Sequence, residues 1–185
     1  ALAEEPNKTA RDYILASLLT GARRTNVLEM RWEQINFERR EWLIPETKNG
    51  ESQRLPLISA MLTLLNDRKV EANGSEWVFP SHGSTGHLTS PDKTWKRVLG
   101  RAGIYDVRGT WLHDLRRSMA SWQANTGASL SIIGKSLNHK NVNTTAVYAR
   151  LAIDPVREAM EKAAGAMFEA GGIKKDNVIN MEVLK

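Results

Sequence analysis

The stretch SIIGKSLNHKNVNTTAVYAR, residues 131–150, places a histidine, His139, nine residues before a tyrosine, Tyr148, with Arg150 close behind. A phenol is a weak nucleophile near neutral pH because its pKa is about 10. Neighbouring cations favour the phenolate, and a positioned base can remove the phenolic proton. Tyr148 is therefore a candidate nucleophile, provided that the rest of the chain supplies a site for its electrophile.

The composition restricts both the partners and the chemistry. A chain of 185 residues can form one domain with its own core. The net charge of +5 favours an anionic partner, with nucleic acid first and an anionic membrane surface second. No amphipathic anchor supports the membrane, and no apolar run approaches the length of a span. Because the chain has no cysteine, a thiol nucleophile, a disulfide framework and thiolate-bound metals are excluded.

Apolar periodicity predicts an α+β fold, mainly helical, with helices around a small three-stranded antiparallel sheet. Alternation between residues 34 and 57 predicts the strands, near 35–37, 42–44 and 55–57. Asn49-Gly50 is a strong hairpin turn signal, which places Lys48 at the tip of the hairpin. Helical spacing and capping residues predict helices over about 8–20, 22–30, 59–70, 90–101, 110–126, 129–137, 143–148 and 154–170.

Finer expectations concern helix ends and the core. Ser90 is expected to cap a helix that has Pro91 in its first turn. Met119, Ala120 and Trp122 are expected to form a core stripe. Asn143 or Thr144 is expected to open the short helix that carries Tyr148. A strand is expected at 178–184.

The polar residues that remain suit a phosphate better than a metal. Arginines give paired hydrogen bonds to phosphate oxygens and stay charged, and histidines exchange protons near pH 7. The chain has no glycine-rich phosphate loop, carboxylate cluster or metal motif, and His82 and His87 lie in a loop without further ligand spacing. Phosphoryl transfer here would therefore rely on protein cations, without metal or other cofactor. The candidate groups are one arginine of the pair after Thr20-Gly21, Lys48, His113, Arg116, His139 and Tyr148.

Five separated motifs carry a family resemblance. They are TGAR at 20–23 followed by LEMRW at 28–32, TKNG at 47–50, HDLRR at 113–117, LNHK at 137–140 and YAR at 148–150. In this order and spacing, the chain resembles the catalytic domain of tyrosine recombinases, the phage-integrase family. The resemblance implies a catalytic domain over 1–170 and a C-terminal tail over 171–185. The opening, ALAEEPNKTARDYILASLL, suggests a fragment, from which the family's N-terminal DNA-binding domain is missing.

The resemblance also implies catalytic roles. Tyr148 would attack a DNA phosphodiester, form a 3′-phosphotyrosyl link and release a 5′-hydroxyl. Lys48 would protonate the leaving oxygen, and His113 would accept the proton of Tyr148 or position the phosphate. Arg23, Arg116 and His139 would stabilise the non-bridging oxygens.

Two positions depart from the family pattern. Asn26 stands where the family often has an acid, so the charge balance beside Arg23 changes. Asn138 stands where the family usually has glycine, and asparagine tolerates a left-handed backbone better than most residues. Neither change removes a proposed catalytic group.

The expected partner is double-stranded DNA at attachment sites. We expect a homotetramer on DNA for the full-length protein, a monomer for this fragment, and a cytoplasmic, nucleoid-associated location. The alternatives are a catalytically silent DNA-binding module and a type IB topoisomerase-like enzyme without strand exchange. A basic helix is usually a solvated face, but it can also follow a phosphate backbone. Candidate DNA contacts are Arg24, Lys93, Lys96, Arg97, Arg117 and Lys140.

Overall fold

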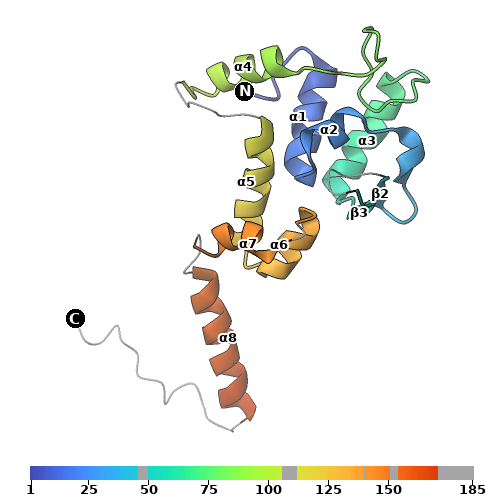
Figure 1. Ribbon diagram of the computed structural model, residues 1–185. Helices are drawn as coiled ribbons and strands as arrows, with labels where there is room; N and C mark the ends of the chain where they lie inside the picture. Colours follow the sequence, from blue (N-terminus) through green and yellow to red (C-terminus); the bar gives the residue numbers. More distant parts are fainter. Residues whose placement is uncertain (46–49, 106–111, 140, 151–153, 171–185) are drawn as a thin grey trace.

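The computed structural model describes residues 1–45, 50–105, 112–139, 141–150 and 154–170 (Figure 1). The predicted class is confirmed: the chain is mainly helical and contains a small three-stranded antiparallel sheet. The elements are α1 (Lys8–Thr20), α2 (Arg24–Leu28), η1 (Trp32–Gln34), β1 (Ile35–Asn36), β2 (Glu41–Ile44), β3 (Gln53–Pro56), α3 (Ser59–Glu71), α4 (Asp92–Arg101), α5 (Leu112–Asn125), α6 (Leu130–Ser136), α7 (Val142–Ala146), η2 (Val147–Arg150) and α8 (Asp154–Ala170), where η denotes a 3-10 helix.

The sheet has the order β1-β2-β3, with β2 in the middle. Trp42 pairs with Ile35 on one side and with Leu55 on the other. Its side chain is fully buried in the main core. The sheet is therefore fixed to the helices by its central strand.

Helix α1 forms the middle of the helical body. The Asn7 side chain accepts from the backbone N–H of Ala10, so it caps the helix at its predicted start. The buried side chains of Tyr13 and Ile14 join the main core, and α1 packs against both α3 and α5. Gly21 ends the helix in the left-handed region, at φ 59°.

A second, smaller cluster lies where α5 meets α6. It consists of Ala120, Ala124, Ile133 and Leu137, and Tyr148 packs against it. This cluster is the structural support of the predicted nucleophile.

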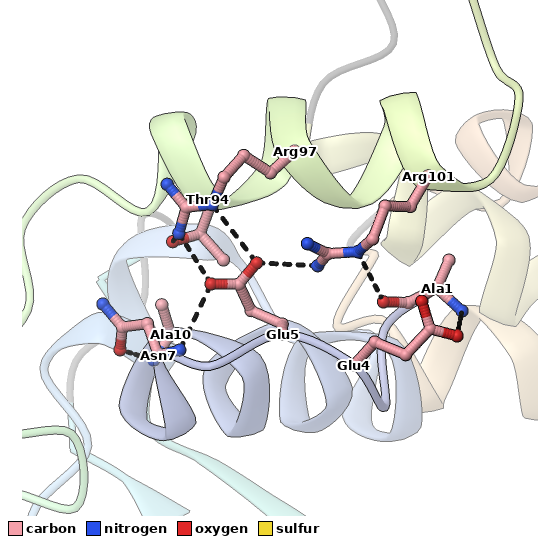
Figure 2. Close-up of polar contacts among 8 residues, drawn as sticks. All are labelled: Ala1, Glu4, Glu5, Asn7, Ala10, Thr94, Arg97 and Arg101. Carbon is pink, nitrogen blue, oxygen red and sulfur yellow. Dashed lines mark hydrogen bonds and ion pairs between the residues drawn. The ribbon is translucent and has the colours of Figure 1, made fainter.

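A buried carboxylate joins the N-terminal segment to α4 (Figure 2). Glu5, which is 2% exposed, accepts from Arg97 Nη2 at 2.6 Å and from Arg101 Nη2 at 2.7 Å. The hydrogen bond from Arg97 is the main cause that lowers the pKa of Glu5 to about 2, against the opposing effect of burial. The first residues are thereby held on the helical body.

The expected capping role of Ser90 is wrong. Helix α4 begins at Asp92, and its N-cap is Pro91. The Ser90 hydroxyl donates instead to the Asp92 carboxylate at 2.5 Å. The hydroxyl therefore binds a side chain of the first turn rather than capping the helix. The carboxylate of Asp92 also complements the helix dipole at this end.

Two further expectations are corrected. Trp122 is 68% exposed, because it lies on the opposite face of α5 from the buried Ala120 and Ala124. Helix α7 is capped by the side chain of Asn141 and ends at Ala146, so Tyr148 lies on η2 rather than on an α-helix.

Some predictions fall outside the described residues. They are the hairpin tip with Lys48, the position of Lys140, the strand at 178–184 and the tail 171–185. None of the helices in the described part of the chain has the length and apolarity that a membrane span requires.

Candidate active site

Arg116 joins the ends of two helices. Its Nη1 donates to the carbonyl of Gly21, at the end of α1, at 2.7 Å, and its Nη2 donates to the carbonyl of Leu137, at the end of α6. The residue is 6% exposed. The last carbonyls of a helix have no donor within the helix, so the guanidinium satisfies groups that would otherwise be buried without partners.

The close approach of these helices requires a glycine at position 21. A Cβ atom there would lie 3.2 Å from side-chain atoms of both Leu137 and Met119. The positive φ of Gly21 disfavours other residues as well. Both the steric limit and the positive φ therefore favour glycine at position 21, whose carbonyl accepts from Arg116.

Arg23 reaches the same turn from α2. The predicted helix over 22–30 is shorter, and Arg23 is its N-cap with an extended backbone. Its Nη2 donates to the carbonyl of Asn138 at 3.4 Å. Its Nη1 is buried and has no hydrogen-bond partner among the residues that the structure describes. A donor of this kind is suited to an anion that enters the site.

Asn138 adopts the left-handed backbone that its position was expected to need, at φ 53°. The turn directs the next residue, His139, toward α7. His139 Nδ1 lies 2.9 Å from Oγ1 of Thr145. Gly134 permits this contact, because a Cβ atom there would lie 3.1 Å from the same hydroxyl.

Sequence reasoning missed Thr145. Its side chain is 1% exposed, and it orients the His139 ring. The signal was weak: a threonine six residues after the histidine in a polar stretch has no distinctive pattern.

Arg23 disfavours the charged form of Arg116, and both arginines disfavour the charged form of His139. Burial is the main cause that lowers the pKa of Arg116, to about 10, and repulsion from Arg23 adds to it, while Tyr148 acts in the opposite direction. Burial, Arg116 and Arg23, in that order, lower the pKa of His139. The pocket is therefore strongly electropositive and prepared for a negative charge.

His113 lies one turn before Arg116 on α5 and is exposed. Partial removal from water, followed by Arg116 and Arg117, lowers the pKa of His113, and Asp114 only partly offsets this. The imidazole is thus neutral near pH 7, the form that a proton acceptor needs.

Tyr148 is half-buried at η2 and packs against the cluster formed by α5 and α6. A charge on its phenol would raise the pKa of Arg116, which is carried by the same α5. The structure thus brings together five of the six predicted catalytic residues. The sixth, Lys48, lies outside the described residues, as stated above. Within the described ranges, no cluster of three metal-ligating side chains is present.

Some of the predicted DNA-contacting residues form ion pairs within the protein, and others are exposed. Arg24 lies 3.6 Å from Asp92 and donates to the Thr89 carbonyl. Arg97 binds Glu5, and Arg117 forms a 3.1 Å ion pair with Asp114. Lys93 and Lys96 are exposed on α4. Their DNA contacts stay predictions, and the buried carboxylate gives Arg97 a structural role in addition.

Residues 1–154 match the model of the phage integrase family. The chain belongs to this family. It is 30% identical to the integrase of Salmonella phage P22 over 172 residues, which cover 84% of the chain and 42% of that protein. It is 28% identical to the tyrosine recombinase XerA of Pyrococcus furiosus over 162 residues, covering 85% of the chain and 56% of XerA. The chain thus spans about half the length of these curated relatives, or less.

Solved structures show the same fold. The pre-cleavage complex of the XerH site-specific recombinase bound to its difH substrate superposes with a TM-score of 0.68 at 20% identity, covering 85% of this chain and 47% of XerH. The catalytic domain of bacteriophage HP1 integrase gives 0.62 at 21% identity, covering 86% of this chain and 87% of that domain. The phage integrase fold therefore extends over most of the chain.

Proposed function

We propose that this chain is the catalytic domain of a site-specific DNA recombinase that cuts and rejoins strands through a 3′-phosphotyrosyl intermediate, without metal. The observation that carries the proposal is the gathering of Arg23, Arg116 and His139 at one turn, with Tyr148 packed against the α5–α6 cluster that supports this turn. Family membership and the fold of the XerH complex with DNA support it.

The chemistry follows from these positions. The Tyr148 oxygen attacks a backbone phosphorus and displaces the 5′-oxygen of the next nucleotide. His113, neutral near pH 7, takes the phenolic proton. Lys48 gives a proton to the departing 5′-oxygen. A 5′-hydroxyl of another strand then attacks the phosphotyrosine, which restores the phosphodiester and frees Tyr148.

The arginines stabilise the charge that builds up on the phosphate. Nη1 of Arg23, buried without a partner in the described part of the chain, would bind a non-bridging oxygen directly. Loss of one such contact typically costs about 3 kcal/mol of transition-state stabilisation. The partner DNA would be a double-stranded attachment site, bound by a homotetramer of the full-length protein in the cytoplasm, at the nucleoid. The 185-residue chain alone would be monomeric.

The test uses a nicked duplex bearing a site selected from a random library by binding of this protein. The cleaved strand loses a short 3′ piece, so the covalent complex accumulates. In EDTA we expect a protein–DNA adduct on a denaturing gel and strand-exchange products with an intact partner duplex. Binding without an adduct would indicate a silent DNA-binding module. Adduct and plasmid relaxation without exchange would indicate a topoisomerase-like enzyme.

A further inference from the structure

The end of α6 is held by three side chains from three other elements. The carbonyls of Ser136, Leu137 and Asn138 accept, in order, from Gln53 Nε2 at 3.1 Å, from Arg116 Nη2 and from Arg23 Nη2 at 3.4 Å. A helix end lacks internal donors for its last carbonyls and carries a partial negative charge, so it attracts donors and cations. Two of these donors belong to the proposed phosphate pocket. The third, Gln53, has no role in it so far.

The backbone N–H groups of this turn point back into α6. Leu137, Asn138 and His139 donate to the carbonyls of Ile133, Lys135 and Gly134. These bonds fix the shape of the turn relative to its own short helix. The position of the turn in the domain therefore depends on what the carbonyl side contacts.

Gln53 provides a contact from the sheet. It is the first residue of β3, is partly buried, and pairs with Ile44 in the middle strand. It lies 83 residues from Ser136 along the chain. The Ser136 hydroxyl also donates to Oε1 of Gln123 on α5 at 3.0 Å. Ser136 thus joins β3, α5 and α6 three residues before His139.

We propose that Gln53 is a positioning residue, whose side-chain amide fixes the turn of residues 136–139 against the sheet and thereby places the His139 imidazole in the phosphate pocket. Its effect on cleavage rests on the proposed function, whereas its effect on the turn does not. The carboxamide acts through the Ser136 carbonyl and does not touch the substrate. Small displacements are costly in such a site, since about 1 Å can reduce a rate about a hundredfold.

The main variant is Gln53→Met, which keeps the length of the side chain and removes the donor. Gln53→Lys restores an N–H donor. Arg54→Met is the matched control, because Arg54 is the next residue of β3 and its side chain is exposed, where it pairs with Glu41. Gln53→Glu, which is isosteric and lacks the donor, replaces the Met variant if that variant does not fold.

Two measurements separate positioning from mere support of the fold. The first is the NMR titration of the His139 ring in the 185-residue chain, with the exposed loop residue His82 as internal reference. The second is the single-turnover rate of adduct formation on the selected duplex, with the Kd for that duplex measured alongside.

For Gln53→Met we expect the His139 titration to move and that of His82 to stay. We expect the cleavage rate to fall about tenfold or more with Kd changed by less than about twofold. Gln53→Lys should restore the rate to within about threefold, and Arg54→Met should change neither measurement. An unchanged His139 titration, or a rate that Gln53→Lys does not restore, would overturn the proposal. If the unmodified chain forms no adduct, the proposed function fails, and the His139 titration still decides the role of Gln53.

Discussion

Arg116 Nη1 donates to the carbonyl oxygen of Gly21 at 2.7 Å, across 95 residues of chain. The other arm of the guanidinium binds the carbonyl of Leu137. One buried cation thus joins the ends of α1 and α6, and it also belongs to the proposed phosphate site. Because the same group serves the packing and the chemistry, its removal is expected to affect both.

Arg116→Met should lower the free energy of unfolding by about 2 kcal/mol, because the Gly21 and Leu137 carbonyls lose their buried donor. Urea unfolding followed by circular dichroism measures this. The control is Arg117→Met, which removes an exposed arginine with a surface ion pair and should cost less than about 0.5 kcal/mol. Equal losses from the two variants would contradict the structural role of Arg116.

Inorganic phosphate should stabilise the free protein, because Arg23 Nη1 offers it a buried donor that is unpaired in the described structure. Relative to chloride at equal ionic strength, we expect the Tm to rise by about 2–4 °C. Arg23→Gln should abolish most of this rise, while Arg39→Gln, at an exposed position of the β1–β2 connection, should keep it. An equal rise in all three proteins would indicate a general salt effect rather than a site.

Acid should destabilise the free protein through the two histidines of the proposed active site. The pKa values of His139 and His113 are lowered in the folded state, so the unfolded chain binds protons more readily. Their contribution to stability is complete above the ordinary pKa of about 6.5 and is lost as pH falls through the lowered values. Urea midpoints between pH 7 and pH 5 measure this slope. A His139→Gln, His113→Gln double variant should show a flatter slope, and an unchanged slope would show that the histidines are not responsible.

Glu5→Gln should destabilise the fold by about 1–2 kcal/mol, since Arg97 and Arg101 lose their common acceptor charge, although the exposure of Arg97 to solvent weakens the pair. Glu4→Gln, one residue earlier and exposed, should have almost no effect. The contribution of Glu5 is present above the ordinary pKa of 4.5 and is lost as the pH falls toward about 2. Thermal unfolding at pH 7 and at pH 3 compares the two variants. Equal changes in their Tm would contradict a specific stabilising contact between Glu5 and the two arginines.

The local patterns that sequence expresses well were predicted correctly. Three of these patterns depend only on residues close by in the sequence. They are the start of α1 beside Asn7, its end at Gly21 and the alternation around Trp42. The left-handed backbone of Asn138 was expected because the family usually has glycine at this position, and asparagine tolerates that backbone. Gly21 lies two residues before Arg23 and Asn138 directly before His139, so these local signals also locate two of the proposed catalytic residues.

What could not be predicted depends on contacts between distant segments. Three contacts join residues from separate elements. They are the Thr145 hydroxyl with the His139 ring, the Gln53 amide with the Ser136 carbonyl, and the Arg116 guanidinium with the Gly21 carbonyl. The basic residues of α4 were predicted only as DNA contacts, but Arg97 also binds Glu5. No sequence pattern links these two residues, which lie 92 positions apart. Only the folded chain brings these partners together.

The most direct test of the central claim is the identity of the residue that becomes attached to DNA. The chain has three tyrosines. Tyr13 is fully buried in the core. Tyr105 is exposed, and its hydroxyl donates to the Gly100 carbonyl. The covalent complex formed in EDTA is digested with protease and nuclease, and the nucleotide-bearing peptide is sequenced by mass spectrometry.

We predict that the nucleotide is attached to Tyr148, that Tyr148→Phe binds the duplex and forms no adduct, and that Tyr105→Phe forms it normally. A nucleotide on Tyr105, or an adduct that persists in Tyr148→Phe, would contradict the account.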